Sequence, residues 1–516
     1  MDRHHKLIGS LVIFLLVTAP AFVATRQTVG NLNNIRFADQ YSGQDCGDKI
    51  NAADKELGSA AGEIWVNNDC GFEWRSPVNL GAGHVLRFHQ GGTYTVSAGI
   101  TMAANSLLTG VTGAMAVNTK PAVMLQVASN QSLAALITVN GPYVAIQDIA
   151  IEGNKANNPS GGSGIVASSK ASRLELNHLS VGNFRANGVS LNGVASAKIF
   201  KLMAYQNDKD GLYCSGGGDG FVTDSEFENN GGNGLTLNSC PAWRINHNDF
   251  GENSQTVPGS CGLTVYGASR APSNFEIITN NQFGNQFRDD LCINGSENTS
   301  VGSNILGNSF IGSNFLLAPN TYSKLVLVGG GLNVISGNVF SASPKRASNQ
   351  YAISVTETHP GGALGNRIVD NAFVDTADNG GSPPWGTARV LDRTTNGISC
   401  LDSSLVLSPA WGTGSAVSYA SGYFPSCVFV ITSGRGSFSV SPTLTLRFPG
   451  SLVQSFNAPP MCQLNVVGIT GVGGSILFNP TSTSLTASVW TAQTYTGAPF
   501  TPAPAESYKV VISCSP

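Results

Sequence analysis

Carboxylate side chains gather at two places in a chain that has only 11% charged residues. At the first place two aspartates flank a lysine, and at the second two adjacent aspartates follow an arginine. A carboxylate can donate or accept a proton, and a neighbouring cation favours its ionised form. These residues are therefore the predicted catalytic acids and bases: Asp208, Asp210, Asp289 and Asp290.

Basic and aromatic residues lie beside these aspartates in the sequence. Cations orient polar or charged substrate groups, and aromatic rings stack on sugars. The predicted substrate-binding residues are Arg185, Lys209, Arg288, Tyr213 and Phe287. The competing interpretation is a solvated turn in which Asp and Asn only supply turn geometry, as expected for Asn187 and Asn233.

An alternative catalytic patch occupies equivalent positions of a sequence repeat. Glu226 and Asp249 are equivalent residues of consecutive copies, and His247 offers a proton carrier. Adjacent coils about 4.8 Å apart would give a carboxylate pair near the roughly 5–5.5 Å of retaining glycosidases. Asp224, Glu226 and Asp249 are also the candidate ligands for Ca²⁺, the one cofactor considered, with Lys201 or an arginine as base. The competing interpretation is a ladder of surface salt bridges.

The repeat that would position these residues runs from Val144 to Thr376. Its template is an aliphatic residue followed, five positions later, by an apolar one, and copies start about 23 to 33 residues apart. Asparagine recurs three positions into the later copies. The template pairs are Ile146/Ile151, Leu176/Val181, Ile199/Ala204, Val222/Phe227, Ile245/Phe250, Ile278/Phe283, Ile305/Phe310, Ile335/Phe340 and Ile368/Phe373, and the asparagines are Asn248, Asn281, Asn308, Asn338 and Asn371.

Short strands with Gly and Asn turns at this period predict an all-β solenoid with stacked aliphatic residues and an inward Asn ladder. With this pattern, residues 40 to 395 resemble the right-handed parallel β-helix of the pectate-lyase-like superfamily. Asn207-Asp-Lys-Asp-Gly-Leu212 and Asp289-Asp-Leu-Cys-Ile293 are each similar to a polygalacturonase motif with one residue inserted. Tyr213 replaces a further Asp of that family, and its G-H-G and R-I-K motifs do not follow.

The predicted domains are a signal peptide at 1–24, a parallel β-helix at 25–395 and an antiparallel β-sandwich at 400–516. A basic start, an apolar run and Ala19-Pro-Ala21 favour the signal peptide over an uncleaved membrane anchor. The helix predicted at 45–57, capped by Asp45, would cover the open end of the solenoid.

Ten cysteines without a CxxC pair favour export and disulfides, with Cys46–Cys70 and Cys462–Cys514 as candidate pairs. The sequence leaves the other pairings open, and the competing interpretation for Cys214, which should point inward, is a free buried thiol. His84, His178 and His359 are expected to be ordinary surface residues.

Three functions follow from these patterns. The first is a secreted (extracellular or periplasmic) lyase or glycoside hydrolase acting on an acidic polysaccharide such as pectin or alginate. The second is a non-catalytic glycan-binding or tail-spike-like fibre protein, for which a homotrimer is expected. The third is a C5 epimerase. A net charge of −3 argues against nucleic acid as a partner, and no membrane contact is expected after signal cleavage.

Overall fold

The computed structural model describes residues 34–111, 121–267, 273–295, 302–311, 321–329, 332–341, 349–356, 366–374, 385–393, 405–423, 426–447, 461–470, 476–484, 487–494 and 498–515. Residues 1–33, which include the predicted signal peptide, and His359 lie outside them. No helix among the described residues is both long and apolar enough to cross a bilayer.

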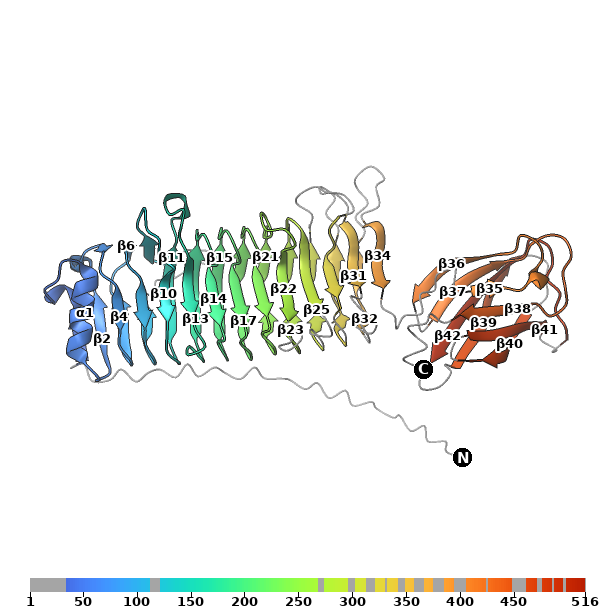
Figure 1. Cartoon of the computed structure of the whole chain (residues 1–516), viewed down its shortest axis with the longest axis horizontal. Helices are drawn as coiled ribbons and strands as arrows, with labels where there is room; N and C mark the ends of the chain where they lie inside the picture. Colours follow the sequence, from blue (N-terminus) through green and yellow to red (C-terminus); the bar gives the residue numbers. More distant parts are fainter. Residues whose placement is uncertain are drawn as a thin grey trace, which may run out of the picture.

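The repeat folds as a solenoid of parallel strands (Figure 1). Each coil contributes one strand to a twelve-stranded parallel sheet on one side of the core. The strands of this sheet, in order, are β4 (Val78–Leu80), β7 (Ile100–Met102), β10 (Ala135–Val139), β12 (Ser163–Ala167), β14 (Val189–Asn192), β16 (Leu212–Ser215), β19 (Leu235–Asn238), β22 (Cys261–Gly267), β25 (Asp289–Gly295), β28 (Leu325–Val328), β31 (Asn349–Thr356) and β34 (Trp385–Arg393).

The other strands of the coils form a bent parallel sheet of 22 strands. In β11, β13 and β15 one long strand turns a corner, and in later coils the same stretch is divided into two short strands. The members are β1 (Ile35–Phe37), β2 (Gly62–Val66), β3 (Glu73–Trp74), β5 (His84–Phe88), β6 (Gly92–Val96), β8 (Leu107–Thr109), β9 (Val123–Val127), β11 (Ala145–Glu152), β13 (Glu175–Gly182), β15 (Lys198–Tyr205), β17 (Phe221–Thr223), β18 (Glu226–Glu228), β20 (Arg244–Asn246), β21 (Asp249–Gly251), β23 (Ile277–Thr279), β24 (Gln282–Gly284), β26 (Asn304–Leu306), β27 (Ser309–Ile311), β29 (Val334–Ser336), β30 (Val339–Ser341), β32 (Arg367–Val369) and β33 (Ala372–Val374).

The register between coils is the one that the repeat predicts. Ile199 pairs with Val222 and Val222 with Ile245, while Phe227 pairs with Phe250. The template residues from Ile146 to Phe340 are all buried in the core, because the left-handed corner between the two positions of each template turns the second residue inward again. The phenylalanines of successive coils stack with ring centroids 4.7 to 5.1 Å apart.

The inward Asn ladder is confirmed. The Nδ2 of Asn248 donates to the Oδ1 of Asn281 at 3.0 Å, and the same bond links Asn281 to Asn308 and Asn308 to Asn338. Each amide therefore satisfies a buried amide of the next coil, and a non-polar residue there would leave buried polar groups unpaired. A second ladder, not predicted, links Asn207, Asn230 and Asn253 at another corner.

A left-handed backbone corner recurs at one position of successive coils. In the coil of Asn248 this position is the residue before the ladder asparagine. Asp148, His178, Lys201, Asp224 and His247 have φ between 50° and 58°. Asn and Asp, and to a lesser degree His, tolerate this conformation better than bulkier residues do.

Helix α1 (Cys46–Leu57) is confirmed at the N-terminal end of the solenoid (Figure 1). The side chain of Asp45 accepts the N–H of Asp48 at 3.1 Å, and Ile50, Ala53 and Leu57 are buried. The short 3-10 helices among the described residues are η2 (Ala38–Gln40), η3 (Asn68–Cys70), η4 (Lys155–Asn157) and η6 (Pro409–Trp411).

The C-terminal residues form two four-stranded antiparallel sheets with a common core around Trp411, Phe429, Trp490 and Tyr508. Fold class is therefore as predicted, whereas the exact domain boundaries remain a prediction. One sheet contains β35 (Leu405–Leu407), β38 (Thr443–Arg447), β41 (Ala487–Thr494) and β40 (Ile476–Thr483), and the other β36 (Ala416–Tyr423), β37 (Ser426–Thr432), β42 (Ser507–Ser515) and β39 (Met461–Thr470).

Disulfides were predicted in part. Cys46–Cys70 is confirmed, and the backbone register places Cys462 opposite Cys514, whose pairing stays a prediction. The competing interpretation of Cys214 as a free thiol is wrong. Cys214 points into the core but is bonded to Cys240, because the chain between them returns Cys240 to a Cα–Cα distance of 6.4 Å.

Two histidine expectations are also wrong. His84 is fully buried, and its Nδ1 lies 2.7 Å from a carboxylate oxygen of Asp54. His178 is half-buried, and its Nδ1 lies 2.6 Å from Asp148 one coil away. In each case a carboxylate compensates for the partial or complete loss of water around the imidazole.

Candidate functional site

Three carboxylates share the outer face of the solenoid at β18 and β21. Glu226 pairs in register with Asp249 of the next coil, as the repeat predicts. Glu228 lies two residues after Glu226 on β18, and the intervening Phe227 is fully buried. Because alternation points Phe227 inward, both glutamates point outward. Glu228 was not among the predicted site residues, although a position two residues after Glu226 on the same strand must face the same side of the sheet.

The proton affinities of these carboxylates differ from those of free side chains. Partial burial, together with the hydrogen bond and charge of Glu226, raises the pKa of Glu228 to about 7. Burial and the charge of Glu228 also raise the pKa of Asp249. Among the described residues, no lysine, arginine or histidine forms an ion pair with any of the three. Burial, reinforced by the hydrogen bond and uncompensated charge of Glu226, thus keeps a proton on Glu228 near neutral pH.

The surface beside Glu228 is open on the following coils. The equivalent positions are Gly251 and Gly284, which carry no side chain. A Cβ built on Gly251 would lie 3.4 Å from Oε1 of Glu228, and one on Gly284 would meet only the carbonyl oxygen of Ile311, at 3.9 Å. Two successive glycines therefore leave room for a ligand next to the acid.

This arrangement predicts a pH-dependent stability that is independent of any activity. The folded-state pKa of Glu228 is raised from 4.5 to about 7. Its protonation therefore contributes stability that is complete below about 4.5 and is lost as pH rises through about 7. We expect Glu228→Gln to melt at a higher temperature than wild type at pH 8, with the gain shrinking toward pH 4.

Scanning calorimetry between pH 4 and pH 8 measures this difference. Glu175→Gln, at another outward position of the coils, controls for the loss of a surface carboxylate. A Glu228→Gln variant that melts below wild type at pH 8 would contradict the raised pKa assigned to Glu228.

The role of His247 as a proton carrier for Glu226 and Asp249 stays a prediction, and among the described residues its ion-pair partner is Asp224. His247 occupies the left-handed corner, with its Nδ1 4.0 Å from Asp224 and 3.3 Å from the amide nitrogen of Asn246. The His247 and Asp224 side chains are 60% and 57% exposed, so this pair adds little. Lys201 is exposed at the same corner one coil before Asp224.

The three predicted Ca²⁺ ligands do not bring their carboxylate oxygens together in the described part of the chain. Only one group of three His, Cys, Asp or Glu residues in the described part of the chain brings its ligand atoms within 4.8 Å of one another, and it does not contain Asp224, Glu226 or Asp249. A calcium ion needs several converging oxygens, so this set would have to rearrange to bind one.

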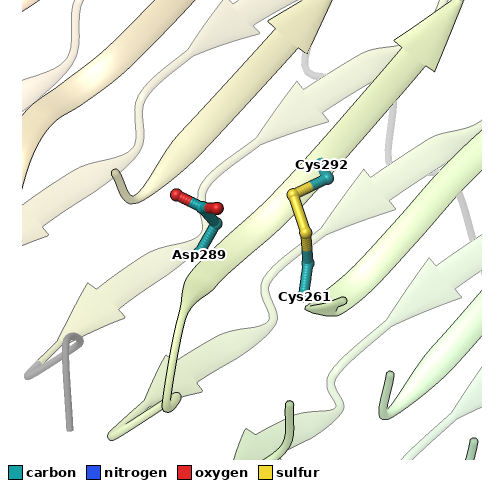
Figure 2. Close-up of side chains that lie close together, drawn as sticks. All are labelled: Cys261, Asp289 and Cys292. Carbon is teal, nitrogen blue, oxygen red and sulfur yellow. A yellow bond between two sulfur atoms is a disulfide. The ribbon is translucent and has the colours of Figure 1, made fainter. Parts of the chain in front are cut away.

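The one gathered group is Cys261, Asp289 and Cys292 (Figure 2). Its two sulfur atoms are joined in a disulfide between β22 and β25, which sequence analysis missed. A disulfide sulfur is not the thiolate that a metal ion requires, so this group is a covalent link between neighbouring coils.

Asp208 lies in a network of ion pairs. Its carboxylate accepts from Arg185 of the preceding coil at 2.9 Å, as the repeat predicts, and from Lys155 of an earlier coil at 2.8 Å. Burial alone would raise the pKa of Asp208, but the hydrogen bonds and charges of Lys155 and Arg185 lower it below the usual value. Asp208, a predicted catalytic acid, and Arg185, a predicted substrate-binding residue, are thus paired with each other.

Asp210 belongs to a ladder at the corner before the twelve-stranded sheet. It accepts the backbone N–H of Asn233 at 2.8 Å and the hydroxyl of Thr236 at 2.7 Å. Asn187 accepts from the N–H of Asp210, and Asn233 from the N–H of Cys261, in the same way. Burial raises the pKa of Asp210, while the donated hydrogen bonds oppose the rise.

The adjacent aspartates of β25 point to different environments. Asp289 accepts the backbone N–H of Ser323 at 2.5 Å, and burial raises its pKa to about 6. Asp290 is fully buried 3.7 Å from the equally buried Lys324. Asp290 therefore does not share the surface position of Asp289, because side chains alternate along the strand, and its catalytic role stays a prediction.

The remaining predicted binding residues are spread over this edge. Lys209 is exposed, and Phe287 and Tyr213 are half-buried. Arg288 donates to the carbonyl of Ser254 and to the hydroxyl of Tyr322, both at 3.1 Å. Tyr213 accepts from the amide of Asn238 at 3.0 Å on the outer face of the twelve-stranded sheet.

Comparisons with known proteins agree with this architecture. The family described as "Right handed beta helix region" matches residues 125–277. The Dettilon tailspike protein shares the fold over 94% of this chain and 95% of its own, with 12% identity and a TM-score of 0.58. This chain is a right-handed parallel β-helix.

Two further structures share only part of the chain. The A-module of mannuronan C-5 epimerase AlgE6 from Azotobacter vinelandii has 15% identity, a TM-score of 0.46, and coverage of 69% of this chain and 97% of its own. DFA-IIIase from Arthrobacter chlorophenolicus A6 has 13% identity, a TM-score of 0.45, and coverage of 68% and 100%. No curated protein sequence matches the chain. At these identities the likeness concerns the fold alone.

Proposed function

We propose that this β-helix is an extracellular glycoside hydrolase whose catalytic carboxylates are Glu228 and Asp249. The observation that carries the proposal is the raised pKa of Glu228, about 7, beside further carboxylates on an open face. Glycoside hydrolysis uses two carboxyl groups, one protonated as an acid and the other ionised as a base or nucleophile.

In this proposal Glu228 is the general acid and protonates the leaving glycosidic oxygen. Asp249 is the general base and activates water. The two residues are one coil (about 4.8 Å) and two residues (about 6.6 Å) apart, so their backbone positions are separated by roughly 8 Å. That spacing suits the water-containing geometry of inverting enzymes, roughly 6.5–9.5 Å between carboxyl groups. Glu226 holds the proton on Glu228 through its hydrogen bond and charge.

The substrate in this proposal is a neutral polysaccharide. Within the described residues the three carboxylates have no compensating cation, so a uronate carboxylate bound there would be repelled. A lyase or C5 epimerase would need a cation beside the uronate carboxylate to favour removal of the C5 proton. The expectation of a pectin- or alginate-like substrate therefore has no support at this site.

A panel of neutral and uronate polysaccharides tests the proposal against the predicted Asp208–Asp210–Asp289 site. We expect reducing ends, with inverted anomeric configuration by proton NMR, from a neutral glycan only. Asp210→Asn and Asp289→Asn are expected to keep turnover and fold, because Asn fills the Asp210 position on neighbouring coils.

Three results would contradict the assignment. Loss of turnover in Asp210→Asn or Asp289→Asn with full activity in Glu228→Gln moves the site to the other edge. Unsaturated products identify a lyase. Retention of configuration favours the directly paired Glu226 and Asp249 over Glu228 and Asp249.

The tailspike likeness favours a second function, that of an extracellular fibre protein. It extends over 94% of this chain and therefore includes the C-terminal sheets as well as the solenoid. Multi-angle light scattering tests the homotrimer that such a role implies. Glycan binding without turnover on any substrate would favour this function.

A further inference from the structure

A hollow of about 410 Å³ lies on the outer face of the twelve-stranded sheet, and none of the carboxylates proposed above lines it. Small-molecule sites commonly have volumes of about 300–1,000 Å³. The hollow lies over β22 and β25 and is bounded by the loop that precedes β22. Its lining residues are Asn233, Val257, Pro258, Gly259, Ser260, Thr264, Tyr266, Gly267 and Asn294.

The loop that forms one wall is fixed by backbone hydrogen bonds. The N–H groups of Thr256 and Val257 both donate to the carbonyl of Gly231 at 2.9 Å, and the N–H of Ser254 donates to Gly232 at 2.7 Å. Val257 is nevertheless 40% exposed. The wall is therefore held against the preceding coil while presenting an apolar rim.

The floor of the hollow is a row of polar side chains in register. Tyr266 lies between Asn238 of the preceding coil and Asn294 of the next. Burial and a hydrogen bond with Tyr213 raise the pKa of Tyr266, so its hydroxyl stays neutral at physiological pH. Asn238 in turn donates to the hydroxyl of Tyr213 at 3.0 Å. These contacts hold Tyr266 in place from one side.

Asn294 completes the row with an amide that is available to a ligand. It is half-buried, and within the described residues its side chain makes no hydrogen bond. Thr264 donates its hydroxyl to Asn233 at 2.6 Å, which leaves the hydroxyl oxygen as an acceptor. The hollow thus combines amide and hydroxyl groups, one aromatic ring and an apolar rim, and no charged residue lines it.

We infer that this hollow is a binding site for a neutral saccharide unit, separate from the proposed hydrolytic site. Amides and hydroxyls match the donors and acceptors of sugar hydroxyl groups, and the tyrosine ring offers an apolar surface to sugar C–H groups. Without a basic residue in the lining, a uronate or a phosphorylated sugar has no charge partner.

The test uses the full chain and titrates it with hexasaccharides of glucose, galactose, mannose and N-acetylglucosamine, and with hexagalacturonate and hexamannuronate. Binding is measured by calorimetry and saturation-transfer NMR in the Glu228→Gln background, so that hydrolysis does not consume the ligand. We expect at least one neutral oligosaccharide to bind and neither uronate to bind. Tyr266→Ala and Asn294→Ala are each expected to weaken binding at least tenfold.

Asn192→Ala is the matched control. Asn192 is exposed in the row that continues through Ser215, Asn238 and Tyr266, but it lies three coils before Tyr266 and outside the hollow. This control is expected to bind as the parent does. Melting temperatures confirm that each variant is folded, and Tyr266→Phe separates loss of the hydroxyl from loss of the ring.

Absence of binding by every neutral oligosaccharide overturns the inference, as does binding that Tyr266→Ala and Asn294→Ala leave unchanged. Preference for a uronate overturns the assigned ligand class. Unchanged binding in Glu228→Gln relative to wild type, measured with a non-hydrolysed ligand, separates this site from the hydrolytic one. Either proposal can therefore fail alone.

Discussion

Glu228→Gln is expected to lower kcat on the neutral polysaccharide by about 10²–10⁴, because it removes the proposed general acid. Wild-type activity should fall as pH rises through about 7, since the pKa of Glu228 is raised to about 7 and the acid must be protonated to donate. Asp249→Asn should lower kcat to a similar extent by removing the base. Initial rates between pH 4 and pH 9 measure both effects.

Glu226→Gln gives a more specific result. The hydrogen bond and charge of Glu226 help to raise the pKa of Glu228, so their removal should move the alkaline limb of the profile to lower pH. Glu175→Gln should keep the wild-type profile. If Glu228→Gln keeps full activity, or its loss is matched by Glu175→Gln, the acid has been assigned to the wrong residue.

Lys324→Met and Asp290→Leu should each destabilise the solenoid by about 3–5 kcal/mol, because each removes the opposite charge that lies closest to a fully buried one. Both side chains are 0% exposed and lie 3.7 Å apart, and burial lowers the pKa of Lys324 while Asp290 opposes that change. The double variant should recover most of the loss, since replacement of a buried pair by apolar residues is often neutral or better. Thermal and denaturant unfolding of the four proteins measures this cycle.

The same cycle tests the earlier expectation that Asp290 is catalytic. A folded double variant that keeps turnover would remove Asp290 from the reaction. A double variant as unstable as the two single losses combined would instead show that the pair is not coupled as the structure indicates. Single variants that melt like wild type would contradict the burial of the charges.

Much of the site could be predicted because strand residues alternate strictly between core and surface. Once Ile199, Val222 and Ile245 were aligned as inward residues, the pairing of Glu226 with Asp249 followed without tertiary information. The same rule would have supplied Glu228, two positions along the strand. It would also have shown that Asp289 and Asp290 face opposite sides.

The environment of residues in turns was harder to predict from the sequence. The direction in which a side chain points at a corner depends on backbone angles that the spacing of neighbouring residues does not determine. Asn207 is part of the sequence that resembles a catalytic motif, yet its side chain accepts the backbone N–H of Phe184 and donates to Asn230 within a buried ladder. Asp210 aligned with Asn187 and Asn233, as predicted, and that alignment itself signalled a structural role at the corner. Contacts between distant coils, such as Lys155 with Asp208, leave no local pattern.

The sequence by itself determined the coil, its register, the Asn ladder and the capping helix, because each depends on short-range periodicity and local hydrogen bonding. Only the tertiary structure decided which carboxylates form ion pairs with a lysine or arginine and which do not. Desolvation and charge repulsion raise the pKa of Glu228, ion pairs occupy Asp208, and burial pairs Asp290 with Lys324. The electrostatic environment of each carboxylate depends on groups that folding brings from other coils, and sequence spacing alone does not contain it.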